Sequence, residues 1–113
     1  MALPTENETW IIEAGDVVIR KEVRSGLASL SPWGKLVYCL WVADYGMRNA
    51  GDLDTAADVY TDFHSEARRL AKQLSLRVTH KAFSLSRRAL QQVYFEQFEA
   101  ICDEIRNAEP STE

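Results

Sequence analysis

Asp44 is the side chain in this sequence whose type and position most suggest chemistry. It lies within residues 32–49, a stretch that is otherwise apolar on nearly every side at helical spacing. A buried carboxylate must be paired or hydrogen-bonded, or it takes up a proton. Arg48 lies one helical turn later and is a local partner, and either His64 or His80 could reach Asp44 through the fold. Asp44 is therefore either a carboxylate that lines a pocket or a structural anchor.

Little else in the sequence supports catalysis. The chain has two histidines and no glycine-rich phosphate loop, nucleophile elbow or H-E-x-x-H motif. Cys39 and Cys102 lack the C-x-x-C spacing of a zinc site and fall in apolar helical segments, so we predict buried free thiols. We predict no catalytic residue, metal or cofactor and interpret Asp44 and Asn49 as buried polar anchors. An enzyme that uses Asp44 is the alternative.

Four acidic residues recur at intervals of four along a predicted helix that follows residue 52. In a continuous helix this spacing places neighbouring carboxylates about 6 Å apart along one face. The row could present a phosphate-like line of charge to a basic protein. It could equally be a solvated face whose first turn suits the helix dipole. The four residues are Asp54, Asp58, Asp62 and Glu66.

Basic residues follow these acids in a block from Arg68 to Arg88 that contains no acid. Arg68, Arg69 and Lys72 begin the block, in the order that the helix dipole favours. The preferred hypothesis is a non-enzymatic protein-interaction domain that binds a basic partner through the acid row, with these three bases beside it. The alternative is a nucleic-acid-binding regulator that uses Arg68 to Arg88. A helix-turn-helix at this place would carry Lys81 at a core position of its recognition helix.

The segment from Trp41 to Leu53 also carries a family resemblance. An acidic residue, an apolar residue, then Asn, a small residue and Gly follow a helix that bears Trp. This pattern resembles a small all-helical bacterial family that includes a DNA-mimic protein, although Ala50 stands where that family usually has Gly and Asp52 where it usually has an aromatic residue. The resemblance implies an all-α fold and a non-enzymatic role in binding a partner. The residues that carry it are Trp41, Asp44, Met47, Asn49, Ala50 and Gly51.

The elements that must position these residues are helices. Ser31 and Pro32 are typical of a helix start and Gly51 of a helix end, so the sequence predicts a central buried helix over Ser31–Asn49. Before it, residues 10–30 predict a helix, interrupted or weakened at Gly15. Its inward positions are predicted to be Ile12, Ile19, Val23, Leu27 and Leu30.

After the central helix the sequence predicts a continuous helix to Leu74, capped by Asp52 or Asp54. Residues 75–86 are ambiguous, and a last helix follows a cap at Ser84 or Ser86. The predicted fold is all-α, a single domain over residues 1–113, built as an irregular bundle of four to five helices. Residues 1–8 and 107–113 are predicted to be frayed.

The overall composition limits the classes of function. The 113-residue chain is 46% hydrophobic, enough for a real core, and its net charge of −4 argues against a dedicated nucleic-acid binder. No signal peptide is recognised in the first residues, and the longest apolar run, residues 36–43, is too short to span a membrane. We therefore expect a cytoplasmic protein with no membrane role, a protein partner and an oligomeric state that the sequence leaves open.

Overall fold

The computed structural model describes residues 5–110 as an all-α fold without strands in that range. It has more helices than the four or five expected, because one predicted helix is divided and the ambiguous segment is helical. The helices are α1 (Glu6–Ser25), η1 (Leu27–Ser29, a short 3-10 helix), α2 (Pro32–Ala50), α3 (Leu53–Val59), α4 (Phe63–Gln73), α5 (Arg77–Ser84) and α6 (Arg87–Asn107).

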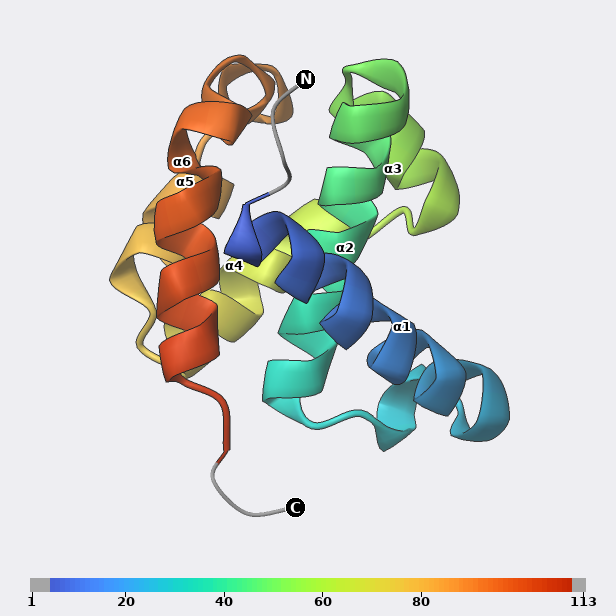
Figure 1. Ribbon diagram of the computed structural model, residues 1–113. Coiled ribbons are helices and arrows are strands. Elements are labelled where there is room, and N and C mark those ends of the chain that lie inside the picture. The colour runs from blue at the N-terminus through green and yellow to red at the C-terminus, as the bar shows by residue number, and fades with distance from the viewer. Residues whose placement is uncertain (1–4, 111–113) are drawn as a thin grey trace.

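The predicted central helix is α2, and the other helices gather around it (Figure 1). α2 packs against α1, α3, α4 and α6, while α5 packs between α4 and α6. Its start and end follow the sequence signals. The Ser31 hydroxyl accepts a hydrogen bond from the Gly34 amide at 3.0 Å, Pro32 occupies the first turn, and Gly51 ends the helix with a φ of 74°.

α1 begins earlier than predicted, at Glu6, and continues through Gly15 without a break. Thr5 and Glu8 form a reciprocal capping box, in which each side chain accepts a hydrogen bond from the backbone N–H of the other. The prediction of a loose segment over residues 1–8 is therefore wrong from Thr5 onward, and residues 1–4 lie outside the described range. At the other end α6 is helical to Asn107, where fraying was expected, and residues 111–113 are not described.

The inward face of α1 also differs from the prediction. Ile12 is 61% exposed and Val23 is 77% exposed, whereas Ile11, Gly15 and Val18 are buried. Gly15 explains this orientation, because a Cβ atom there would lie 2.2 Å from Cδ1 of Trp41. The absence of a side chain lets α1 rest directly on the indole of α2, and this contact turns the face that carries Gly15 inward.

The helix predicted up to Leu74 is divided into α3 and α4 at residues 60–62. Phe63 is fully buried at the start of α4, and Tyr60, at the break, packs its ring against Tyr38 of α2 at 5.6 Å between centroids. Changing direction here lets both short helices cover α2. The core is one cluster of buried side chains. Its largest fully buried members include Tyr94, Phe63, Phe83, Ile11, Leu36 and Leu40.

Candidate functional site

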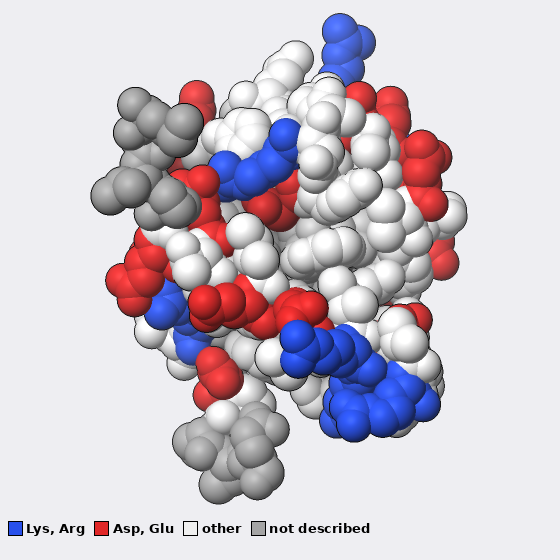
Figure 2. Space-filling model, turned by 45° about the vertical axis from the view of Figure 1, so that its right-hand side comes forward, with Lys and Arg blue, Asp and Glu red and all other residues white. Residues whose placement is uncertain are grey.

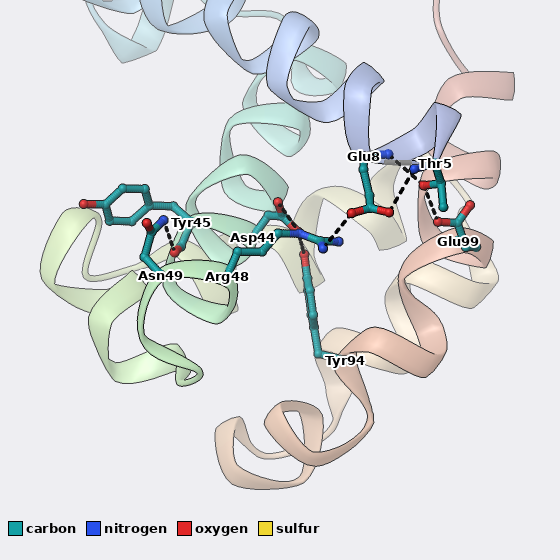
Figure 3. A network of polar contacts seen from close by, with 8 residues as sticks. All are labelled: Thr5, Glu8, Asp44, Tyr45, Arg48, Asn49, Tyr94 and Glu99. Carbon is teal, nitrogen blue, oxygen red and sulfur yellow. Dashed lines mark hydrogen bonds and ion pairs between the residues drawn. The ribbon is translucent and has the colours of Figure 1, made fainter. Parts of the chain in front are cut away.

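Asp44 lies on the buried side of α2, where it is 6% exposed. Its Oδ1 accepts hydrogen bonds from the Tyr94 hydroxyl at 2.8 Å and from Nε of Arg48 at 3.0 Å (Figure 3). Nε of Arg48 also lies 3.1 Å from Oδ2. Burial raises the pKa of Asp44, and the bonds from Tyr94 and Arg48 offset part of that rise. The partner expected one turn along the helix is present, and Tyr94 joins it from α6.

Arg48 connects this buried carboxylate to α1 at the protein surface. Its NH1 group donates to Oε2 of Glu8 at 2.9 Å, so one guanidinium joins two carboxylates from different helices (Figure 3). The same guanidinium lies over the rings of Phe95 and Phe98, at 5.1 and 4.8 Å from their centroids. Its side chain is 33% exposed. Arg48 is therefore held by charge on one side and by two aromatic rings of α6 on the other.

A second group of polar contacts continues from Glu8 along the junction of α1 and α6. The Thr5 hydroxyl donates to Glu99 at 2.9 Å. Asn7 is 4% exposed, and its amide donates to Glu99 at 2.8 Å and to Asp103 at 2.9 Å. Arg106 donates to the Asn7 carbonyl oxygen at 2.9 Å. The beginning of α1 is thus fixed to the last helix by a chain of hydrogen bonds.

This arrangement suits a structural anchor better than a reactive group. Both oxygens of Asp44 are already engaged by protein donors, and the residue is closed off by its own partners. His64 is committed elsewhere, because its Nε2 lies 2.9 Å from the Leu85 carbonyl oxygen. Asn49 differs from the expectation of a buried anchor: it is exposed, and its amide donates to the Tyr45 carbonyl oxygen of its own helix at 2.9 Å.

The four acids of the predicted row do not share one helix. Asp54 and Asp58 belong to α3, Asp62 precedes α4 and Glu66 lies in its first turn. Asp54 pairs with Arg87 at 3.1 Å while its side chain stays 81% exposed, and Glu66 pairs with Arg69 at 2.7 Å. Asp58 and Asp62 are exposed, and neither forms an ion pair with another residue between 5 and 110. The acids therefore form a bent surface over the α3–α4 junction.

The basic block spans the end of α4, the whole of α5 and the start of α6. Ser75, in the turn between α4 and α5, has a φ of 60°, the left-handed conformation for which glycine is usual. Arg68, Lys72 and His80 line one surface recess across this turn. Lys81 is exposed, and α5 buries Thr79, Ala82 and Phe83 in the core instead.

The sequence did not predict two polar side chains that cap helices far from them along the chain. Glu104 of α6 accepts hydrogen bonds from the amides of Val78 and Thr79, at 2.9 and 2.7 Å, and so caps the start of α5. Gln91 accepts from the Leu53 amide at 2.9 Å at the start of α3. The one available signal was the absence of a good local cap before α5. A cap supplied from 25 residues away leaves no periodic pattern in the sequence.

The two cysteines lie in the core, away from the polar network around Asp44. Cys39 and Cys102 are free and buried, and burial raises the pKa of Cys39 to about 12. No cluster of three or more His, Cys, Asp or Glu residues suited to a metal ion occurs within residues 5–110. None of the helices in that range combines the length and apolar content needed to cross a bilayer.

Comparisons of the chain with protein-family models, with curated proteins and with solved structures found no match. The resemblance to the all-helical family with a DNA-mimic member therefore stays an expectation. The residues that carry it lie at the end of α2, where Asp44 is an anchor, Trp41 supports α1, and Gly51 ends the helix. These positions have structural roles in this fold whatever its relatives are.

Proposed function

We propose that this chain is a non-enzymatic protein-interaction domain that binds a basic partner through the acids of α3 and the start of α4. The observation that supports the proposal is the exposure of Asp58 and Asp62 together with their unpaired charge. Both carboxylates are exposed at the α3–α4 junction, and neither is neutralised by a basic residue within the described range. A charge that its own protein leaves unpaired can attract a partner of opposite sign at little desolvation cost.

The division of the acid row changes how such a partner would bind. On one straight helix the carboxylates would form a line, whereas two helices that meet at an angle spread them over a surface. Asp54 and Glu66 flank the two unpaired carboxylates. Asp54 forms an ion pair with Arg87, and Glu66 forms one with Arg69. Arg68, Arg69 and Lys72 continue along α4 and give the surface a basic edge. A partner with Lys or Arg facing the acids and Asp or Glu facing this edge would bind in one orientation.

The test is a salt titration of binding to a partner captured from the source cell and then purified. Reversing both Asp58 and Asp62 to Lys should weaken binding at least tenfold at low salt, because like charges would then face each other. The difference should shrink as salt is raised, since exposed charges are screened beyond about 8–10 Å at physiological ionic strength.

Glu96→Lys is the matched control, because Glu96 is an exposed acid on α6. The control should bind like the wild type. Equal binding by the control and the double reversal, with the helical circular dichroism of both intact, would contradict the proposal.

Nucleic-acid binding through Arg68 to Arg88 is the second candidate. The turn at Ser75 and the basic recess beside it favour this reading, because they join two helices across a short connection, as a helix-turn-helix does. Titration with duplex DNA separates the candidates. If this surface contacts phosphates, Arg68→Ala and Arg69→Ala should each lower the salt slope by about one unit, and Asp58→Lys with Asp62→Lys should tighten binding.

A further inference from the structure

One side of α1 exposes an apolar stripe that its own fold leaves uncovered. Ile12 and Val23 are 61% and 77% exposed, and Ile19 lies between them on the same side of the helix, partly buried. Trp41 and Tyr45 of α2 adjoin the stripe. The indole of Trp41 rests against Gly15, and the Tyr45 ring stacks on Trp41 at 5.6 Å. Isolated exposed apolar residues are ordinary, but a contiguous aliphatic and aromatic face marks an interaction surface.

The space-filling view shows this face as an uncharged field (Figure 2). Charged residues border it below, with a basic cluster at the lower right, and acidic residues lie along its right edge. The stripe from Ile12 to Val23 extends over eleven residues, about 16 Å of helix. That length matches the contact line of a second helix of similar size.

The charges along α1 indicate what that second helix is. The exposed acids Glu13 and Asp16 lie in the middle of α1. The exposed bases Arg20, Lys21 and Arg24 lie in its second half together with the half-buried Glu22, so that half keeps a net positive charge. Two copies of such a helix attract each other when they run antiparallel, because each acidic half then lies beside a basic half. Parallel packing would place like charges together.

The spacing of the apolar and charged residues agrees with one antiparallel register. When Ile12 lies opposite Val23 of a second copy, Asp16 falls one residue from the position opposite Arg20. Glu13 and Lys21 line the separate groove beside Val17 and lie outside this contact. The apolar stripe and the Asp16–Arg20 pair thus define nearly the same centre, as a two-fold interface requires.

We propose that a second copy of this chain docks on the α1 stripe and forms a two-fold dimer through antiparallel α1 helices. Ile12, Ile19 and Val23 form the apolar centre, with Trp41 and Tyr45 extending it onto α2. The pair between Asp16 and Arg20 within one helix is exposed on both sides, so these side chains can exchange partners across the axis. The proposal does not depend on the acidic surface of α3 and α4.

Sedimentation equilibrium of the full chain tests this inference. The wild type should sediment at twice its chain mass of 12.8 kDa. Two single variants, Ile12→Glu and Val23→Lys, should each shift the protein to monomer. Each should raise the dimer dissociation constant at least tenfold, because each would bury a charge in the apolar centre. Both positions are exposed and both new residues favour helix, so the monomer should keep its fold and its circular dichroism.

Val17→Glu is the matched control, because Val17 is 65% exposed on α1 but lies off the stripe, against a separate surface groove. This variant should remain a dimer. Charge reversal tests the register: Asp16→Arg and Arg20→Asp should each weaken the dimer about tenfold, and the two together should restore it.

A wild-type chain that stays monomeric up to about 100 µM, a very weak affinity on the scale of specific complexes, would overturn the proposal. So would a Val17→Glu variant that dissociates as readily as Ile12→Glu. Failure of the double reversal to restore the dimer would overturn the antiparallel arrangement. Asp58→Lys with Asp62→Lys should stay dimeric, so loss of partner binding and loss of the dimer are separate results.

Discussion

Asp44 shows how one residue can be well satisfied and still titrate abnormally. Burial is the largest influence on its pKa and raises it, while Tyr94 and Arg48 stabilise the ionised form. Glu8 shares Arg48 but lies at the surface, and its pKa is lowered, chiefly by the hydrogen bond from the Thr5 amide. The two carboxylates on one guanidinium therefore have pKa values shifted in opposite directions.

The Asp44→Asn variant tests whether the pKa of Asp44 is raised in the folded state. Because the folded pKa of Asp44 lies above its ordinary value of 3.8, the folded state binds more protons than the unfolded state between the two pKa values. Its contribution to stability is then fully present below the unfolded pKa and falls as pH rises through the folded pKa. The free energy of unfolding of the wild type, relative to Asp44→Asn, should decline from pH 3 toward neutrality in urea titrations. A constant or rising difference would contradict the raised pKa.

Truncation of the same residue tests the anchor itself. Asp44→Ala leaves the Tyr94 hydroxyl without an acceptor and removes one of the two carboxylates on Arg48, so it should cost on the order of 3 kcal/mol in the free energy of unfolding. Tyr94→Phe removes a single hydrogen bond and should cost about 1 kcal/mol. Urea unfolding at pH 7 measures both. A loss below about 0.5 kcal/mol for Asp44→Ala, typical of surface sites, would show that the network carries little stability.

At the scale of the elements, the sequence predicted helices more reliably than their faces. The start and end of α2 followed from Ser31, Pro32 and Gly51, which act through local hydrogen bonds and backbone conformation. The inward face of α1 did not follow, because two apolar stripes compete along that helix. The choice between them depends on the contact of Gly15 with Trp41, a residue 26 positions away. Periodicity locates a stripe, but it does not say whether the core or another surface covers it.

Gly15→Ala tests the close approach of α1 and α2. Alanine favours helix over glycine by about 1 kcal/mol, so a free surface site would gain stability. Here the new Cβ would lie 2.2 Å from the Trp41 ring, and the resulting displacement should produce a net loss of about 1–2 kcal/mol. Gly34→Ala is the milder comparison, because its Cβ would come no closer than 3.3 Å to a neighbour, the Ser31 Oγ, so it should lose less stability than Gly15→Ala. Thermal unfolding of both should separate them, and a stabilised Gly15→Ala would refute the contact.

Glu104→Ala tests the cap that α6 supplies to α5. The amides of Val78 and Thr79 would lose their acceptor, and the start of α5 would lose a favourable negative charge. Loss of an N-terminal cap typically costs about 1 kcal/mol, and hydrogen exchange at these two amides should accelerate by about tenfold. Glu104→Gln keeps one acceptor oxygen and should recover part of the protection. Unchanged exchange in Glu104→Ala would show that α5 does not need this cap.

At the scale of the whole molecule, the two ends of the described chain close the bundle. Thr5 and Asn7 at the start of α1 form hydrogen bonds with Glu99 and Arg106 of α6, which lie nearly a hundred positions later in the chain. The candidate site was predictable in the same uneven way. Asp44 and Arg48 stand out because they are one turn apart, whereas Tyr94 and Glu8 become partners only when distant helices meet. The sequence shows the acids and bases themselves. The break at residues 60–62 places the acids on two helices instead of along one helical face, and periodicity did not predict it.

Asn7→Ala tests this closure. The substitution removes a buried amide that donates to Glu99 and Asp103 and accepts from Arg106, so it leaves several groups of α6 without a partner. Each unpaired group costs free energy, and the expected loss is about 2 kcal/mol in the free energy of unfolding. Thr9→Ala is the control, because Thr9 is exposed two residues further along α1 and should change stability by less than about 0.5 kcal/mol. Urea unfolding of both variants should be followed by circular dichroism at one protein concentration, since self-association would add its own stabilisation. Equal stability of the two variants would mean that the hydrogen bonds between Asn7 and α6 contribute little to the stability of the bundle.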